Sequence, residues 1–164
     1  MRCDSFRHAR RSIRLQGFDY RTPRAYFVTI CTWNRFHLLG DVVDGSLKIS
    51  PIGRVVRDCW QELPNKFPNA QLDEFVVMPN HLHGIIRLVG APLMAPGNRA
   101  PTLGEVIRHF KAIATREVHR IDSSIPIWQR NYYERIIRVN GELERVRRYI
   151  RDNPKNWGND PENM

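Results

Sequence analysis

The chain has 164 residues, of which 41% are hydrophobic, and no stretch approaches the ~20 consecutive apolar residues of a membrane span. Its three cysteines lie far apart and form no CxxC pair, which argues against a disulfide framework and against a zinc–thiolate site. Lysine and arginine outnumber aspartate and glutamate by 26 to 17, and the net charge of +9 indicates a polyanionic partner, most often nucleic acid. We expect one domain over residues 1–164, in the cytoplasm because the N-terminus lacks the apolar stretch of a signal peptide.

Residues 1–24 form a strongly basic arm, in which seven arginines stand against two aspartates. A guanidinium suits bidentate contacts to phosphate and stacking on bases, so arginines are well suited to bind nucleic acid. Within the arm we expect Arg10, Arg11 and Arg14 to make such contacts. The alternative is a generally basic protein without a dedicated nucleic-acid site.

The segments that follow the arm predict a strand, a hairpin and a helix. The β-branched and aromatic stretch AYFVTICTWN (25–34) predicts a core strand. In LLGDVVDGSLKIS (38–50), Asp-Gly between short apolar runs predicts a β-hairpin. Ser50 and Pro51 are typical of a helix N-cap and first helical position, and apolar residues then recur at helical spacing up to Pro64, where we expect the helix to end.

The second half of the chain alternates strands and helices. QLDEFVVMPN and HLHGIIRLVG (71–90) predict two strands, or one strand broken near Pro79. A helix opens at Thr102, which has Glu105 in the spacing of a capping box. The remaining expected elements are an extended segment (125–139), a turn (140–141), a last helix (about 141–152) and a tail (155–164).

This order of elements predicts the fold class. A strand, a hairpin, a helix, two strands, a helix, a strand and a helix favour an α+β sandwich, in which helices pack on a mainly antiparallel sheet. The ferredoxin-like arrangement is the natural candidate.

Two histidines, His81 and His83, stand one residue apart in the strand expected over 81–90. Because strand side chains alternate between faces, both rings point the same way, about 7 Å apart along the strand. Two imidazoles on one face can converge on one metal ion. The alternative is a structural role, with each ring satisfied by a backbone carbonyl.

The last helix carries a tyrosine at the edge of its apolar stripe. Tyr149 lies about 60° around the helix axis from Val146, which belongs to the stripe, and Asn153 follows one turn later on nearly the same side. If this helix packs beside the histidine strand, it brings a phenol and an amide oxygen to the metal, and two nitrogens with one oxygen and open positions suit Mg²⁺ or Mn²⁺. Three arginines of the helix are expected to face outward: Arg147, Arg148 and Arg151.

Several of these blocks carry a family resemblance. MPNHLHGII (78–86) resembles the His-hydrophobic-His signature of the HUH single-strand nucleases. VRRYIRDNP (146–154) resembles the helix of the single-tyrosine transposases, in which a polar metal ligand follows the tyrosine by four residues. WQRNYYERIIR (128–138) and the start RRSIRLQGFDY…AYFVTICTWN look like the REP-associated tyrosine transposases, a domesticated bacterial branch of that family. The similarity spans about residues 10–157.

The resemblance implies a set of roles. His81 and His83 would bind Mg²⁺ or Mn²⁺, Asn153 would be the third ligand, and Tyr149 would be the nucleophile. The reaction implied is cleavage and strand transfer of single-stranded DNA through a 5′-phosphotyrosine. The DNA implied is a short palindromic hairpin with a flanking single strand, and the protein would be a monomer or a homodimer.

Some positions stay open at this stage. Arg135 stands where many relatives have histidine after NYYE, so it either assists the chemistry or contacts DNA. Tyr132 and Tyr133 are competing nucleophiles by composition, although they lie in an extended segment and the family places its tyrosine on a helix. Further contacts to DNA are expected from three cations: Arg108, Lys111 and Arg130.

Two other functions compete with this interpretation. A replication initiator of the HUH type would share the chemistry but act at an origin, and WQRNYYERIIR argues against it. A non-catalytic ferredoxin-like nucleic-acid-binding module would use its histidines structurally and would bind DNA without forming a covalent adduct.

Overall fold

The computed structural model describes residues 24–89, 100–138 and 140–163, so the expected contacts of Arg10, Arg11 and Arg14 lie outside the described residues. Among the described residues, none of the helices combines the length and apolar character needed to span a membrane. The elements in chain order are β1 (Arg24–Cys31), η1 (Trp33–Arg35), β2 (Gly40–Val43), β3 (Ser46–Ile49), α1 (Pro51–Gln61), α2 (Leu63–Lys66), β4 (Ala70–Met78), β5 (His81–Leu88), α3 (Leu103–His119), β6 (Tyr133–Ile137), α4 (Asn140–Asp152) and η2 (Trp157–Asn159).

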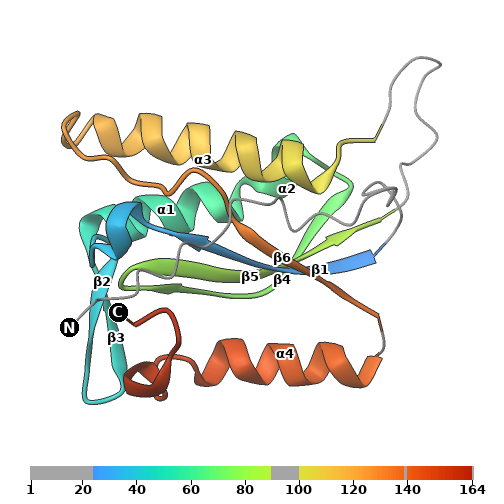
Figure 1. Ribbon diagram of the computed structural model, residues 1–164. Helices are drawn as coiled ribbons and strands as arrows, with labels where there is room; N and C mark the ends of the chain where they lie inside the picture. Colours follow the sequence, from blue (N-terminus) through green and yellow to red (C-terminus); the bar gives the residue numbers. More distant parts are fainter. Residues whose placement is uncertain (1–23, 90–99, 139, 164) are drawn as a thin grey trace, which may run out of the picture.

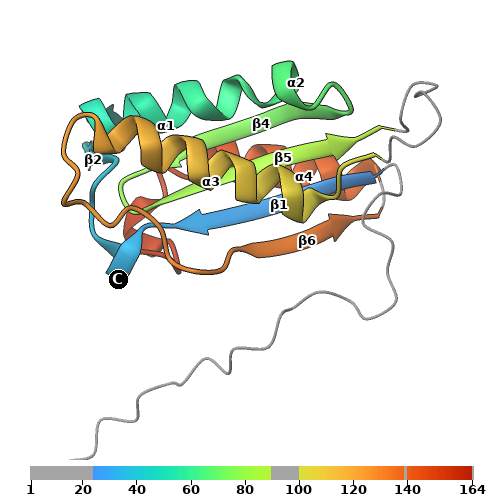
Figure 2. The ribbon, with the colours of Figure 1, turned by 90° about the horizontal axis from the view of Figure 1, so that it is seen from above.

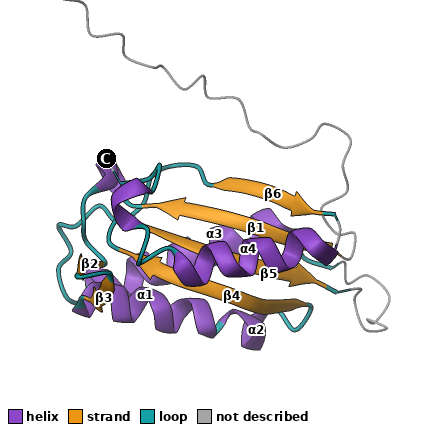
Figure 3. Ribbon diagram, turned by 90° about the horizontal axis from the view of Figure 1, so that it is seen from below, coloured by secondary structure: helices purple, strands orange, loops and turns teal. Residues whose placement is uncertain are grey.

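Four strands form one sheet in the order β4-β5-β1-β6, and every neighbouring pair is antiparallel. Without the inserted β2–β3 hairpin, the chain runs β1-α1-β4-β5-α3-β6, which is the ferredoxin-like order, so the predicted fold class is confirmed. Helices α1 and α3 cover one face of the sheet (Figures 1 and 2). Helix α4 covers the opposite face, so the molecule has a third layer (Figures 1 and 3).

The local sequence signals explain most element boundaries. The Ser50 side chain accepts a hydrogen bond from the Gly53 amide at the start of α1, and Thr102 and Glu105 form the predicted capping box of α3. The hairpin turns at an Asp-Gly pair in which both residues have positive φ, as expected. Helix α1 ends three residues before Pro64, which instead lies in the first turn of the short helix α2, where proline costs no hydrogen bond.

Two expected boundaries in the C-terminal third differ from the structure. Of the extended segment, only Tyr133–Ile137 forms a strand, which pairs with β1, while Trp128 makes an isolated β-bridge with Thr32. The turn expected at 140–141 is the first turn of α4, which begins at Asn140.

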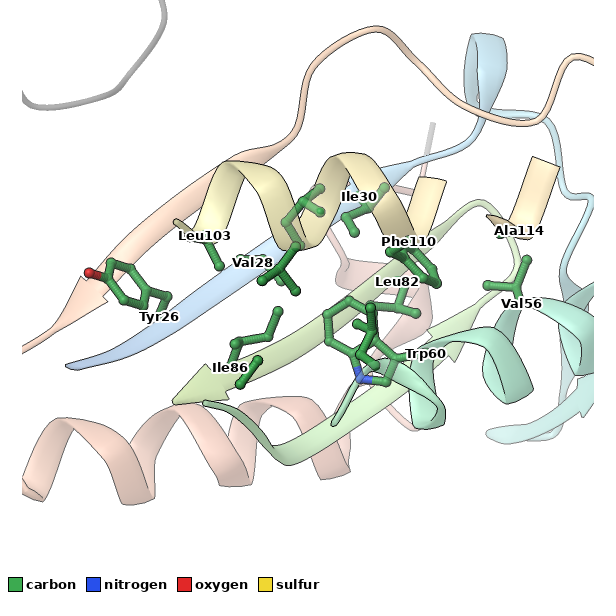
Figure 4. Close-up of a cluster of buried hydrophobic side chains, with 14 of the residues drawn as sticks. Tyr26, Val28, Ile30, Val56, Trp60, Leu82, Ile86, Leu103, Phe110 and Ala114 are labelled. Carbon is green, nitrogen blue, oxygen red and sulfur yellow. The ribbon is translucent and has the colours of Figure 1, made fainter. Parts of the chain in front are cut away.

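The core between the sheet and helices α1 and α3 is built around Trp60, which is fully buried (Figure 4). The Trp60 ring meets Phe110 of α3 edge-on at 5.1 Å between ring centroids. It also lies over Gly84 of β5, where a Cβ atom would come within 2.5 Å of the ring. Glycine therefore follows His83 because the indole fills the space on the opposite face of the strand.

A second, smaller core holds α4 against the other face, with Val146 and Ile150 packed on residues of β1, β5 and β6. Arg148 and Arg151 are exposed, as predicted, whereas the prediction that Arg147 faces outward is wrong. Arg147 is half-buried and makes two hydrogen bonds of 2.7 and 2.6 Å to the carboxylate of Asp73, and Arg151 pairs with a neighbouring residue of β4. These ion pairs position α4 along β4, and the Arg147 pair is directional because it is bidentate.

Candidate metal and tyrosine site

The β5 strand brings His81 and His83 together on the face that α4 covers. Cross-strand pairing places His81 opposite Cys31 and His83 opposite Thr29. The two histidines are 0% and 2% exposed, and their ring centroids are 4.3 Å apart. The shared face predicted from the spacing of the pair is therefore observed, in a buried setting.

The orientation of the His81 ring is set by Asn80, in the two-residue turn before β5. The Asn80 amide nitrogen donates to the Glu162 carbonyl at 2.7 Å, so the Asn80 amide oxygen faces His81 Nδ1 at 2.8 Å. His81 Nδ1 must then carry the proton, which leaves the Nε2 lone pair free. That Nε2 atom is buried and has no hydrogen-bond partner in the described part of the chain.

The His83 ring is held from β1 and aimed at α4. Its Nδ1 lies 2.8 Å from the Thr29 hydroxyl, and its Nε2 lies 3.4 Å from the Tyr149 hydroxyl. A hydroxyl can accept from Nδ1, so His83 can also offer Nε2 as a ligand.

Both histidines are neutral at physiological pH. Burial and the positive charge of Arg35 lower the pKa of His81 to about 3. Burial and the neighbouring His81 hold the pKa of His83 well below its ordinary value, against an opposite effect of Asp160. Neutral imidazoles are the form that binds metal, so no proton has to be displaced from the ligand nitrogens.

A third candidate ligand, Asp160, comes from the segment that the sequence analysis treated as a tail. Asp160 is buried, and its Oδ2 lies 4.0 Å from His81 Nε2. The ligand atoms of His81, His83 and Asp160 all lie within 4.8 Å of one another. No spacing signal in the sequence links a lone aspartate to histidines almost 80 positions earlier.

The segment after α4 is folded back over the histidines by several contacts. The Trp157 ring lies 6.0 Å from the His81 ring between centroids, and the Glu162 amide donates to Asp160 Oδ1 at 2.7 Å. The Glu162 side chain forms an ion pair with Arg35. Contacts of Trp157, which precedes Asp160, and of Glu162, which follows it, therefore hold Asp160 in the site.

Asn153, the third ligand implied by the family resemblance, also lies at this site. Its amide nitrogen donates to Asp160 Oδ2 at 2.6 Å. Its amide oxygen is buried and finds no hydrogen-bond partner among residues 24–89, 100–138 and 140–163. Two buried acceptor atoms without partners, beside a carboxylate, are what a cation site requires, because such atoms are costly unless something satisfies them.

Tyr149 lies at the open side of the cluster and is 43% exposed. Its ring is 5.3 Å from the His83 ring and meets Phe27 edge-on at 6.0 Å between centroids. Burial and the Asp160 carboxylate raise the pKa of the Tyr149 phenol, while Asn153 acts in the opposite direction. Without a cation the phenol is therefore protonated at neutral pH.

The two competing tyrosines lie farther from the histidines. Tyr133 is on β6 opposite Thr29, so it shares the face of His83 but is two strands away from it, about 10 Å by the spacing of strands. Tyr132 packs against the core on the α3 side of the sheet. Of the three, Tyr149 is the one whose hydroxyl reaches a histidine of the pair.

The cations expected to contact DNA fall on both faces of the sheet. Arg135 is exposed on β6 opposite Phe27, on the face of the histidines, and forms an ion pair of 3.5 Å with Glu142 of α4. Arg108, Lys111 and Arg130 line a hollow beside α3, on the other side. The expected set of contacts is therefore divided between two surfaces.

Comparison with other proteins places the chain in a family. No protein-family model matches it. It is 38% identical, over an alignment of 166 positions, to an uncharacterized protein of Haemophilus influenzae strain Rd, and the alignment covers 93% of this chain and 92% of that protein. The chain therefore belongs to the family of this Haemophilus protein.

Solved structures identify the fold more closely. A structure of a REP-associated tyrosine transposase bound to a REP hairpin superposes with a TM-score of 0.62 and 21% identity, covering 83% of this chain and 69% of that one. The chain has the fold of the REP-associated tyrosine transposases. A crystal structure of a Deinococcus radiodurans R1 protein, assigned provisionally as a transposase, matches with a TM-score of 0.51 and 13% identity over 85% of this chain and 95% of that one. The resemblance found in the sequence is thus confirmed at the level of the REP-associated tyrosine transposase fold.

Proposed function

We propose that this protein is a metal-dependent DNA strand transferase that uses Tyr149 as its nucleophile. The observation that carries the proposal is the position of the Tyr149 hydroxyl, 3.4 Å from His83 Nε2 and beside the His81–His83–Asp160 cluster. A tyrosine exposed on one side and next to a candidate cation site on the other can meet both a DNA strand and the charge that stabilises its reaction.

The residues present fit a divalent cation. His81 Nε2 and the Asn153 amide oxygen are buried acceptors with no partner in the described segments, and His83 Nε2 and the Asp160 carboxylate adjoin them. Such a mixed nitrogen and oxygen set, with positions left for substrate, suits Mg²⁺ or Mn²⁺. Bound there, the cation would polarise the scissile phosphodiester and offset the negative charge that develops on it.

Tyr149 then performs a covalent transfer. Its phenol oxygen attacks the phosphorus, the bond from phosphorus to the 3′ oxygen breaks, and the phenol proton leaves to solvent while the departing 3′ oxygen takes one up. The products are a 5′-phosphotyrosine and a free 3′-hydroxyl. Because the covalent bond conserves the phosphodiester energy, a second 3′-hydroxyl can attack it and rejoin the strands.

We propose single-stranded DNA, next to a short palindromic hairpin, as the substrate. The REP-associated tyrosine transposase of similar fold is bound to a REP hairpin, and Arg135 adds an exposed cation on the face of the site. A flexible single strand can enter a site flanked by a helix, and arginines can follow its phosphates. A cytoplasmic location and a monomeric or homodimeric state remain predictions.

Covalent adduct formation tests the proposal. A hairpin with a single-stranded flank, labelled on the 5′-phosphate side of the cut, is incubated with the protein and Mn²⁺ and run on a denaturing gel. Wild-type protein is expected to give a covalent band, whereas Tyr149→Phe, which keeps the ring, gives none while still binding the DNA. Tyr133→Phe is the matched control, because Tyr133 is equally exposed on the same face, and it should behave as wild type.

Each contrary result points to a defined alternative. An adduct that survives in Tyr149→Phe and disappears in Tyr133→Phe would move the nucleophile to β6. DNA binding without an adduct in wild-type protein, across a library of hairpins, would favour the non-catalytic binding module.

A further inference from the structure

A hollow of about 670 Å³ lies between α3 and the segment 128–132, which leads into β6. Figure 2 shows this segment returning beside α3 toward β6. Because α3 and α4 cover opposite faces of the sheet, the hollow lies on the face away from the histidines and Tyr149. It is therefore separate from the proposed catalytic site.

Lys111 of α3 holds in place the wall of the hollow opposite α3, which residues 129–131 form. Its ammonium donates to the backbone carbonyls of Gln129 and Asn131 at 2.5 and 3.1 Å. Burial lowers the pKa of Lys111 to about 8. The ammonium thus holds the backbone of 129–131 against α3, and its role here is to position this wall.

The open rim of the hollow is cationic. Arg108 and Arg130 are exposed on opposite walls, and neither has an ion-pair partner among the described residues. The one acidic residue of the lining, Glu105, accepts hydrogen bonds from the backbone and hydroxyl of Thr102 in the capping box. These two exposed guanidinium groups favour an anion that reaches across the rim, such as a phosphate.

The interior of the hollow is aromatic. Tyr132 and Trp128 line it, and the Trp128 ring is backed by Phe110 at 5.6 Å between centroids. The indole N–H of Trp128 is buried and lacks an acceptor within the described residues. An aromatic floor beneath a cationic rim matches the two parts of a nucleotide, since bases stack on aromatic rings and phosphates bind guanidinium groups.

We propose that this hollow is a second nucleotide-binding site, which takes an unpaired nucleotide of the DNA at a distance from the cut. The inference rests on the proposed function, and it adds a route by which single-stranded DNA runs from this hollow to the catalytic site. Successive residues of the edge segment point to opposite faces, so Tyr132 lies toward the hollow and Tyr133 and Arg135 toward the histidines. A single strand that rounds the β6 edge would meet both sites.

Photo-crosslinking locates the contact without any substitution. A DNA hairpin with a randomised single-stranded flank, carrying 5-iodouridine at flank positions, is irradiated with the full-length protein, and the crosslinked peptides are identified by mass spectrometry. We expect crosslinks within 128–132, in addition to any near Tyr149. An excess of a free mononucleotide is added in a parallel arm. If the mononucleotide removes the crosslink only at concentrations far above that of the DNA, the site takes a nucleotide that is part of a DNA strand. Loss of the crosslink when mononucleotide and DNA are at equal concentration would identify a site for free nucleotides and overturn the proposal.

Salt dependence of affinity tests the two arginines. In Arg108→Ala/Arg130→Ala, the slope of log K against log salt for the same hairpin should fall by about 1.4, because each lost single-strand phosphate contact removes about 0.7. The control Arg116→Ala/Arg120→Ala removes the same amount of charge at the C-terminal end of α3, from arginines already paired with Glu117, and should change the slope by less than half as much.

The outcomes separate this inference from the proposed function. Unchanged slope in Arg108→Ala/Arg130→Ala, or crosslinks confined to other peptides, would overturn the second site while leaving adduct formation by wild-type protein intact. Absence of the adduct, with crosslinks at 128–132 and a reduced slope, would overturn the proposed chemistry and leave this surface as a DNA-binding site.

Discussion

The buried His81 predicts a defined loss of stability in mild acid in metal-free protein. Its pKa is lowered to about 3 by burial and by Arg35, whereas in the unfolded chain it returns to its ordinary value near 6.5. Between these values the unfolded state binds one more proton than the folded state, so the free energy of unfolding falls as pH falls. The stability is fully present above the unfolded pKa and decreases as pH drops below it.

The magnitude follows from the two pKa values. Lowering the pH from 7.5 to 5.5 should cost about 1.4 kcal/mol through His81 alone, because protonation at 5.5 favours the unfolded state about elevenfold. His83 contributes in the same direction, since its pKa is also lowered by burial. The ordinary pKa values of aspartate and glutamate lie near 4, so carboxyl groups contribute little in this window.

Urea denaturation at a series of pH values, in the presence of a chelator, measures this effect. His81→Gln keeps a polar side chain but does not titrate, so its stability should vary with pH by about 1.4 kcal/mol less than that of wild type over the same range. Because the comparison is between the changes of unfolding free energy with pH, any constant loss of stability caused by the substitution itself cancels. Equal dependence of stability on pH in the two proteins would refute the assignment of His81 as a buried, neutral imidazole.

Three further predictions concern the site and its support. Replacing His81 and His83 together with alanine should abolish Mn²⁺ binding measured by calorimetry, and Asn153→Ala should weaken it without eliminating it, because one ligand of several is lost. Asp160→Asn should lower Mn²⁺ affinity by at least about tenfold, and an unchanged affinity would remove Asp160 from the ligand set. Arg147→Ala should lower the free energy of unfolding by about 1–2 kcal/mol in urea denaturation, because it breaks two hydrogen bonds to a half-buried carboxylate; a loss within error would show that the ion pair does not hold α4.

Much of the site followed from periodicity. The i, i+2 spacing places His81 and His83 on one face of any strand, whatever the rest of the chain does, and the helical angle places Tyr149 at the edge of a buried stripe. Capping residues Ser50 and Thr102 marked two helix starts for an equally local reason, because a cap bonds to amides within three residues of itself. These features depend on neighbours in sequence, so a single sequence contains them.

Tertiary structure decided which of these local features meet. Asp160 enters the site because the segment after α4 folds back and is held by contacts to Asn80 and Arg35, side chains more than 80 positions away along the chain, and no pattern in the sequence encodes that return. The surroundings of Arg147 also depend on tertiary structure. In an isolated helix this side chain would be in water, whereas here it is partly buried against Asp73 of β4. The division of the basic residues between two faces depends on which side of the sheet each helix covers, and hence on the packing of the whole domain. Long-range packing therefore completes a site whose separate parts are already set by local geometry.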